Sequence, residues 1–253
     1  MRIGSLFSGI GGLELGLERA GVGHVVWQCE IDPFCRAVLA KNWPHVVSRY
    51  TDVRTLSPEN DPILYADLIC GGFPCQDLSD AHTAGGRGAG LDGPKSGLWF
   101  ELLRVIVNTA PRWIVVENIM PCERWLPRVR GDLHERGYSC VPLLVRASDV
   151  GAPHERPRCF AIAHTNGEGQ PLRAVDVEVA GVRALSEARR DWGTAPPGGF
   201  RVADGVPSGV DRNRALGNAV VAACAEVVGR VIVALDAEKG SAGSATNTEG
   251  KDQ

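Results

Sequence analysis

Short apolar runs alternate with amphipathic stretches along the first two-thirds of the chain. Runs with strand-like composition predict strands over 2–7, 24–29, 46–47, 66–70, 113–116, 138–145 and 158–163. Apolar positions three and four residues apart predict helices over 13–20, 33–42, 97–109 and 121–136. The last two predicted strands follow each other and predict a hairpin-like pair. This alternation of strands and helices predicts an α/β fold with a mostly parallel, doubly wound sheet.

The alternation ends after the last predicted strand. Residues 165–210 are rich in Gly, Pro and Arg and predict no core element. A long helical pattern returns over 211–235, and the tail 237–253 consists mainly of Gly, Ser, Thr and charged residues. Such a tail has too little apolar surface to fold, so we expect it to be disordered.

The composition fits one folded domain with a small appendage. The chain has 253 residues, of which 44% are hydrophobic, enough for a buried core. Its 8 cysteines form no Cys-x-x-Cys pair and no secretory pattern is complete near Met1, so a reducing, cytoplasmic location is expected. No apolar run is long enough to span a membrane, and we expect neither a membrane contact nor a metal site.

Charge is distributed unevenly along the chain. The net charge is −3, yet residues 121–215 carry 14 basic and 12 acidic side chains, and every basic one is Arg. Arg suits bidentate contacts with phosphate and guanine. A solvated helix face is the other explanation for any single Arg, so the charge pattern alone leaves nucleic-acid binding open.

The first predicted strand runs into a glycine-rich turn, residues 8–12 (SGIGG). Such a turn either is purely structural or lets a ligand approach the backbone at a helix N-terminus. Glu30 ends the second strand and could accept both ribose hydroxyls; Asp52 follows the third and could accept from an adenine amino group. Because the turn is not Gly-x-Gly-x-x-Gly and holds no Lys or Arg, it favours an adenosine cofactor without phosphate.

A cysteine, Cys75, lies just past the fourth predicted strand, in the segment 70–79 (CGGFPCQDLS). A free cysteine is often an apolar core filler. The proline before it and the two polar residues after it oppose that interpretation, because they place the thiol in a polar loop. The thiolate is the nucleophilic form and a nearby Arg lowers a thiol pKa, for which Arg156 and Arg158 are the candidates.

A carboxylate, Glu117, comes directly after the apolar run 113–116. Burying a carboxylate is costly unless it is paired or protonated, and a buried one can act as a general acid with a raised pKa. A purely structural carboxylate is the alternative. In an open α/β sheet Cys75 and Glu117 would both lie at the carboxyl edge, where ligands bind, so they form a candidate nucleophile–acid pair.

The segment 73–76 (FPCQ), followed by Glu117-Asn118, resembles the signature of the cytosine-C5 DNA methyltransferases. Five further features resemble motifs of that family and stand in the same order. They are 7–12 (FSGIGG), Glu30 with Asp52, 96–98 (SGL), 151–158 (GAPHERPR) and 216–220 (LGNAV). One match is only suggestive, but seven in the expected order are highly specific.

The resemblance implies a Rossmann-like S-adenosylmethionine-dependent methyltransferase sheet with a small irregular target-recognition appendage. It implies that Cys75, Glu117, Arg156 and Arg158 are catalytic. The cofactor-binding residues that it implies are Phe7, Gly9, Ile10, Gly12, Glu30, Ile31, Asp52, Val53, Pro74, Leu98 and Asn218.

The same resemblance implies four regions along the chain. They are a catalytic and cofactor-binding domain (1–164), a target-recognition region (165–205), a C-terminal segment that packs back on the catalytic domain (206–236) and a disordered tail (237–253).

The chain departs from the family pattern in two places. His154 stands where Gln is commoner, which affects a structural hydrogen bond more than the chemistry. Only 59 residues separate Arg158 from Asn218, where family members usually place a much longer target-recognition region.

The expected reaction is transfer of a methyl group from S-adenosylmethionine to C5 of a flipped-out cytosine, through an intermediate in which Cys75 is bonded to C6. Double-stranded DNA is the expected partner, a cognate restriction endonuclease in the same cell is a further candidate, and a monomer is expected. Three alternatives stay open: a cytosine-C5 RNA methyltransferase, a non-catalytic DNA-binding relative, and a small-molecule methyltransferase without an Arg-rich cleft.

Overall fold

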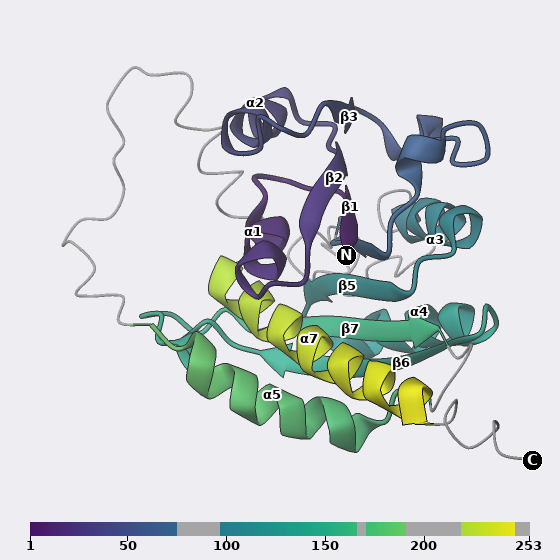
Figure 1. Ribbon diagram of the computed structural model, residues 1–253. Helices are drawn as coiled ribbons and strands as arrows, with labels where there is room; N and C mark the ends of the chain where they lie inside the picture. Colours follow the sequence, from purple (N-terminus) through teal and green to yellow (C-terminus); the bar gives the residue numbers. More distant parts are fainter. Residues whose placement is uncertain (75–96, 166–170, 191–218, 246–253) are drawn as a thin grey trace, which may run out of the picture.

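The computed structural model of the chain describes residues 1–74, 97–165, 171–190 and 219–245, with side chains described up to residue 238 (Figure 1). Seven strands form one sheet. The strands are β1 (Arg2–Leu6), β2 (His24–Cys29), β3 (Ser48–Tyr50), β4 (Leu68–Gly71), β5 (Trp113–Ile119), β6 (Tyr138–Val145) and β7 (Arg158–Thr165). The helices are α1 (Gly12–Arg19), α2 (Pro33–Asn42), α3 (Leu98–Thr109), α4 (Leu126–His134), α5 (Ala174–Ala188) and α7 (Ala222–Ala245).

The strands lie in the order β3-β2-β1-β4-β5-β7-β6. β1 to β5 are parallel, whereas β7 is antiparallel to both of its neighbours. The sheet is therefore mostly parallel, as the sequence predicts. The chain reverses its direction of strand addition between β1 and β4, and open α/β sheets bind ligands beyond the carboxyl ends of the strands at such a point.

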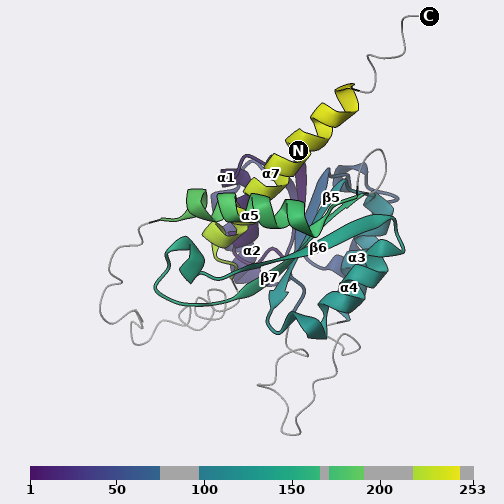
Figure 2. The ribbon, with the colours of Figure 1, turned by 90° about the horizontal axis from the view of Figure 1, so that it is seen from below.

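Helices cover both faces of the sheet (Figure 2). α1, α5 and α7 lie on one face, and α3 and α4 lie on the other. Ile114 and Val115, neighbours in β5, are buried in the two opposite clusters, as the two-residue period of a strand requires. Burial on both faces explains why the strands read as continuous apolar runs.

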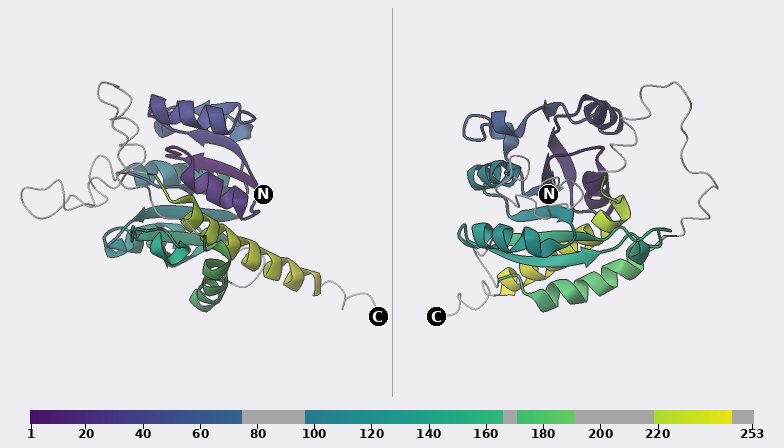
Figure 3. Two further views of the ribbon diagram at one scale, coloured as in Figure 1. Left: turned by 90° about the vertical axis from the view of Figure 1, so that its left-hand side faces the viewer. Right: turned by 180° about the vertical axis from the view of Figure 1, so that it is seen from behind.

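The 24-residue helix α7 packs against α1 and α5, and its last turns project from the rest of the molecule (Figure 3). Gly16 lets α1 and α7 approach closely, since a Cβ there would lie 2.4 Å from the Cβ of Ala225. The same approach brings Val220 to Gly12, where a Cβ would lie 2.2 Å from the Val220 carbonyl oxygen. α7 thus carries the residues that precede it to the glycine turn at the end of β1.

Two expectations about the second half of the chain are wrong. Residues 165–210 were expected to form no core element, but α5 lies among them and buries Val177, Ala184 and Ala188 against β6 and α7. Its buried positions are small residues, which give a weak apolar signal. The tail was expected to be disordered from 237, but α7 continues to Ala245, and residues 246–253 lie outside the described part.

Several predicted boundaries shift while the elements remain. The third strand is Ser48–Tyr50 and not 46–47, because Val46 is buried whereas Val47 is 87% exposed. The predicted helix 121–136 divides into a 3-10 turn at Cys122–Arg124 and α4, which has a proline in its first turn, where the missing N–H costs nothing. β5 runs three residues beyond 116, so Glu117 lies within it.

Other predictions are confirmed as made. α2 spans Pro33–Asn42, and the Asp32 side chain caps it by accepting from the N–H groups of Phe34 and Cys35. The predicted hairpin-like pair is the antiparallel pair β6–β7.

Candidate active site

A pocket lies at the carboxyl ends of β1 and β4. Its walls come from segments far apart in the sequence. They are the turn 7–12, Glu14 of α1, Gly72 after β4, Glu117 of β5 and residues 219–220 before α7. Four of the residues predicted to bind the cofactor, Phe7, Gly9, Ile10 and Gly12, line it together with the predicted acid Glu117.

The turn at the end of β1 has an unusual backbone. Phe7, Gly9 and Gly11 have positive φ angles of 55°, 55° and 87°. Glycine adopts this region easily, but Phe7 does so at a cost in free energy, and such residues cluster at functional sites. Gly12 then begins α1. The first turn of this helix, whose N–H groups have no partner within the helix, therefore lies at the wall of the pocket.

Glu30 is held at the end of β2 by two backbone donors. Its Oε2 accepts from the Gly9 N–H at 2.8 Å, and its Oε1 accepts from the Asp32 N–H at 2.8 Å. These bonds tie the carboxylate to the glycine turn. Each oxygen retains capacity for another donor, which suits a pair of ribose hydroxyls. The adjacent Ile31 is 65% exposed, so its side chain is free to cover a ligand.

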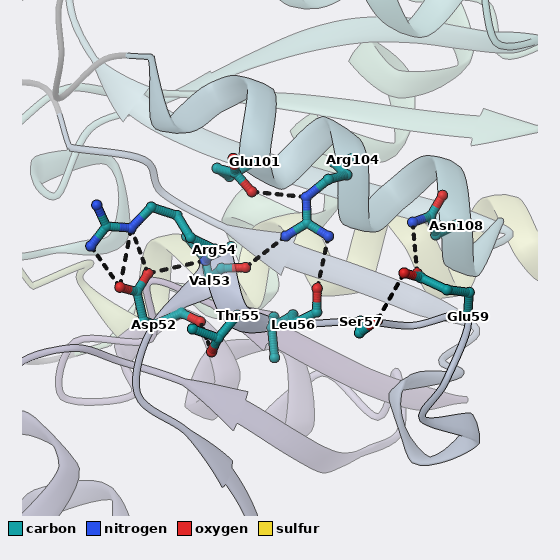
Figure 4. Close-up of polar contacts among 10 residues, drawn as sticks. All are labelled: Asp52, Val53, Arg54, Thr55, Leu56, Ser57, Glu59, Glu101, Arg104 and Asn108. Carbon is teal, nitrogen blue, oxygen red and sulfur yellow. Dashed lines mark hydrogen bonds and ion pairs between the residues drawn. The ribbon is translucent and has the colours of Figure 1, made fainter.

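Asp52 already has a partner in the structure (Figure 4). Arg54 binds its carboxylate through Nε at 2.9 Å and Nη2 at 2.6 Å, and this hydrogen bonding holds the pKa of Asp52 below its usual range. The Arg54 side chain is itself 63% exposed. An adenine amino group would therefore share Asp52 with Arg54 or displace it.

The turn after Asp52 is tied to α3 by Arg104 (Figure 4). Its guanidinium donates to the carbonyl oxygens of Val53 at 2.9 Å and Leu56 at 2.7 Å, and to Glu101 at 2.8 Å. Leu98, predicted to contact the adenine, is the first residue of the same helix. α3 thus positions both sides of the predicted adenine site, a link that the sequence analysis missed.

Glu117 is buried beside an arginine. Its Oε1 lies 2.9 Å from Nε of Arg158, and its side chain is 10% exposed. Burial raises the pKa of Glu117 to about 7, against the opposing effect of Arg158 and Arg156. A Cβ on Gly72 would lie 2.6 Å from Oε2, so only glycine allows the backbone beyond β4 to pass this close.

The two predicted catalytic arginines have different positions. Arg158 begins β7 and pairs with Glu117, whereas Arg156 precedes it in a left-handed conformation, with φ 38°. Arg156 Nη2 donates to the carbonyl oxygen of Ala219 at 2.8 Å. Arg156 therefore connects the loop before β7 to the residues that precede α7.

Cys75 and Asn218 lie outside the described residues, but their neighbours are placed. Asn118 Nδ2 donates to the Phe73 carbonyl oxygen at 3.1 Å, which ties the chain leading to Cys75 to the end of β5. Pro74, the last described residue before Cys75, is partly buried. At the other end, Ala219 and Val220 line the pocket.

A buried carboxylate that the sequence analysis did not single out, Glu14, also lines the pocket. It is 0% exposed, and burial raises its pKa to about 7. Its Oε1 accepts from the Ser5 hydroxyl at 2.6 Å, whereas its Oε2 has no hydrogen-bond partner. The available signal was a carboxylate next to Leu13 on the apolar face of a predicted helix.

The sequence offers five arginines for contacts with DNA: Arg173, Arg183, Arg189, Arg190 and Arg201. Three of them have acidic partners in the structure. Arg173 pairs with Asp176 and Arg183 with Glu187, both on α5, and Arg190 pairs with Glu226 of α7. The first two pairs are local to α5, whereas the Arg190–Glu226 pair ties the end of α5 to α7. Arg201, also considered for this role, lies outside the described residues.

The described ranges 1–74, 97–165, 171–190 and 219–245 contain no candidate metal site and no candidate membrane span. There, no group of three or more His, Cys, Asp or Glu side chains is arranged to hold a metal ion. No helix among those residues is both long and apolar enough to cross a membrane.

This strand order, with one reversed strand and a glycine turn at its switch point, defines the S-adenosylmethionine-dependent methyltransferase fold. The model of the C-5 cytosine-specific DNA methylase family matches residues 1–192. The chain belongs to this family.

Individual relatives agree with the family assignment. Type II methyltransferase M2.BsuMI of Bacillus subtilis is 37% identical over 174 residues, 64% of this chain and 42% of the relative. Type II methyltransferase M.AquIA of Picosynechococcus is 28% identical over 224 residues, 76% of this chain and 88% of the relative. A crystal structure of a prophage-encoded DNA modification methyltransferase (E. coli) is similar at 26% identity and a TM-score of 0.57, over 70% of this chain and 50% of that one.

Proposed function

We propose that this chain is a DNA (cytosine-5-)-methyltransferase that uses S-adenosylmethionine. The chain spans less than half the length of M2.BsuMI and most of M.AquIA, so the activity of the whole protein is a proposal. The observation that supports it best is Glu117, which is buried, arginine-paired and partly protonated at neutral pH, at the wall of the pocket formed by the glycine turn.

The residues around the pocket fit the cofactor. Glu30 would hold the ribose hydroxyls, Asp52 the adenine amino group, and Ile31, Val53 and Leu98 the faces of the adenine. The backbone of the turn 7–12 allows close approach, and Pro74 and Asn218 are proposed to complete the site. When bound, S-adenosylmethionine supplies an electrophilic methyl group on a sulfonium.

Cytosine C5 is a poor nucleophile, and the proposed mechanism makes it reactive. Cys75 thiolate adds to C6, which breaks the C5=C6 double bond, while Glu117 donates a hydrogen bond at the N3 edge and stabilises the charge that develops there. C5 then takes the methyl group. Loss of the C5 proton and expulsion of Cys75 restore the aromatic ring and the thiolate.

Arg156 and Arg158 have supporting roles in the proposed mechanism. Arg158 keeps the carboxyl group of Glu117 in place, and Arg156 holds the loop of Arg158 against residue 219. Because C6 and N3 are inaccessible in a stacked duplex, the target cytosine must be flipped out of the helix.

Methylation mapping tests the proposed function. Expression in a host that lacks cytosine-C5 methylation should produce 5-methylcytosine that bisulfite sequencing detects in the host DNA. Purified protein should methylate a DNA duplex and leave the matched RNA unmodified. Methylation of RNA alone would indicate the RNA enzyme, and no methylation of either would indicate a non-catalytic relative or a small-molecule substrate.

The target sequence should be short or relaxed, because little of the chain is available to read bases. α5 packs against β6 and α7, Arg173 and Arg190 at its two ends are paired, and 33 residues (189–221) separate it from α7. A bidentate base contact discriminates by about 1–3 kcal/mol, so a few contacts specify a few base pairs.

Methylome sequencing after expression measures this target. Binding of the protein to DNA should weaken strongly with salt, because phosphate contacts dominate its affinity. A long, unique motif methylated by this chain alone would contradict the prediction. A monomeric state and a cognate restriction endonuclease remain proposals of the same kind, which size-exclusion chromatography and a co-expression assay can test.

A further inference from the structure

Glu14 is the most unusual charged group in the described part of the molecule. It lies in the first turn of α1 and is completely buried between this helix and the sheet. Ser5 of β1 donates to its Oε1 at 2.6 Å, and Ser5 in turn accepts from Ser8 at 2.9 Å. No cationic side chain among the described residues pairs with it, and no hydrogen bond of ordinary geometry reaches its Oε2. Ser8 and the backbone N–H of Glu14 lie near enough to oppose the rise of its pKa.

A buried carboxylate without a counter-ion is costly to keep. Folding alone would be better served by an apolar residue at this position, between Leu13 and Leu17 of the same buried surface. Burial raises the pKa of Glu14 to about 7, so a cation placed beside Oε2 would favour the charged form. The arrangement therefore suits a ligand that brings a positive charge with it.

The pocket is electrostatically one-sided. Its lining includes two carboxylates, Glu14 and Glu117, and no basic side chain from the described residues. Glu117 is neutralised in place by Arg158. Glu14 is thus the carboxylate of this pocket that lacks a cationic partner among the described residues, and its Oε2 is buried without a hydrogen bond.

The order of the strands indicates which part of the cofactor reaches Glu14. Asp52 and Glu30 follow the neighbouring strands β3 and β2, and Glu14 lies next to β1, one strand further along the sheet. A cofactor with its adenine at Asp52 and its ribose at Glu30 would extend its amino-acid end toward β1. That end carries an ammonium group.

We propose that Glu14 is a further cofactor-binding residue, whose Oε2 accepts hydrogen bonds from the α-ammonium group of S-adenosylmethionine while Ser5 holds Oε1. This inference rests on the proposed function, because it assumes an adenosyl amino-acid cofactor. It adds Glu14 to the cofactor-binding residues that the resemblance implies.

Calorimetric binding tests the inference without turnover. The ligands are S-adenosylhomocysteine and its deamino analogue, which keeps the carboxylate but lacks the ammonium group. Glu14→Gln should weaken S-adenosylhomocysteine binding by about 10- to 100-fold, the range for a charge-assisted hydrogen bond. The same variant should change binding of the deamino analogue by less than about threefold, because the partner of Glu14 is missing from it.

Glu30→Gln is the matched control. It removes the same charge from a residue predicted to hold the ribose, so it should weaken both ligands equally. Equal weakening of both ligands by Glu14→Gln, or no weakening of either, would overturn the inference while leaving the proposed function intact. Failure of the unmodified protein to bind either ligand would overturn the proposed cofactor and the inference together.

Circular dichroism and thermal melting show whether the variants are folded. If Glu14→Gln does not fold, Ser5→Ala provides the same comparison with a smaller change, since it keeps the carboxylate and removes the hydroxyl that donates to Oε1 and accepts from Ser8. This variant should weaken S-adenosylhomocysteine several-fold and leave the deamino analogue unchanged. An equal effect on the two ligands would again contradict the role of Glu14.

Discussion

Cys75→Ser should reduce methyl transfer to background while leaving cofactor binding unchanged. A thiol is a few per cent thiolate at neutral pH and is intrinsically a strong nucleophile, whereas an alcohol is almost entirely protonated and far weaker. Cofactor affinity is predicted to depend instead on Glu30 and Asp52, which lie beyond other strands of the sheet. Transfer of labelled methyl groups to DNA, together with calorimetry of S-adenosylhomocysteine, measures both properties.

A second cysteine variant shows that the effect belongs to Cys75. Cys122 is a partly exposed free cysteine on the 3-10 turn after β5 and does not line the pocket, so Cys122→Ser should retain activity. DNA containing 5-fluorocytosine should form a covalent complex with the unmodified protein, because fluorine cannot leave as a cation and elimination stalls after methylation. Normal turnover by Cys75→Ser, or intact masses that show only free protein with the fluorinated DNA, would contradict attack at C6.

Local sequence signals predicted the elements whose boundaries depend on neighbouring residues. α2 matched its predicted range because Asp32 caps it and Pro33 occupies its first turn. β6 and β7 were predicted as a pair because both are apolar and adjacent in sequence. The glycine turn and the strand-end carboxylates could be placed at one edge because parallel strands bring their carboxyl ends together.

Long-range packing decided the features that the sequence analysis missed. The burial of Glu14 depends on the sheet beneath it and on α7, which closes over α1 more than 200 residues later in the chain. The sequence does not show that Arg190 is paired, because its partner, Glu226, lies in α7 and reaches it only in the folded chain. The sequence gives no sign of the contacts of Arg104, because the carbonyl oxygens that it binds lie on a turn about 50 residues earlier.

The carboxyl group of Glu117 should titrate within the pH range of catalysis. Its pKa of about 7 is raised by burial and opposed by Arg158 and Arg156. A general acid must be protonated, so its contribution to kcat/KM is present below this pKa and lost as the pH rises through it. Cys75 requires the opposite, because more thiolate forms at higher pH, and the two together predict a bell-shaped pH profile.

Glu117→Gln should fold normally and lose about 10²–10⁴-fold in the rate of methyl transfer, the usual contribution of a general acid. The amide is nearly isosteric and can still accept from Arg158, but it cannot supply a proton. Single-turnover kinetics across pH 5–9 isolate the chemical step. In the unmodified protein the rate should level off above about pH 7, where Glu117 loses its proton while the thiolate of Cys75 still increases, whereas in the variant the rate should keep rising with pH. Glu123→Gln, an exposed residue on the turn after β5, removes the same charge and should leave the rate unchanged. A loss of less than about tenfold in Glu117→Gln, or a wild-type rate that rises through neutrality as steeply as that of the variant, would assign Glu117 a structural role, because the buried pair with Arg158 would then serve the fold alone.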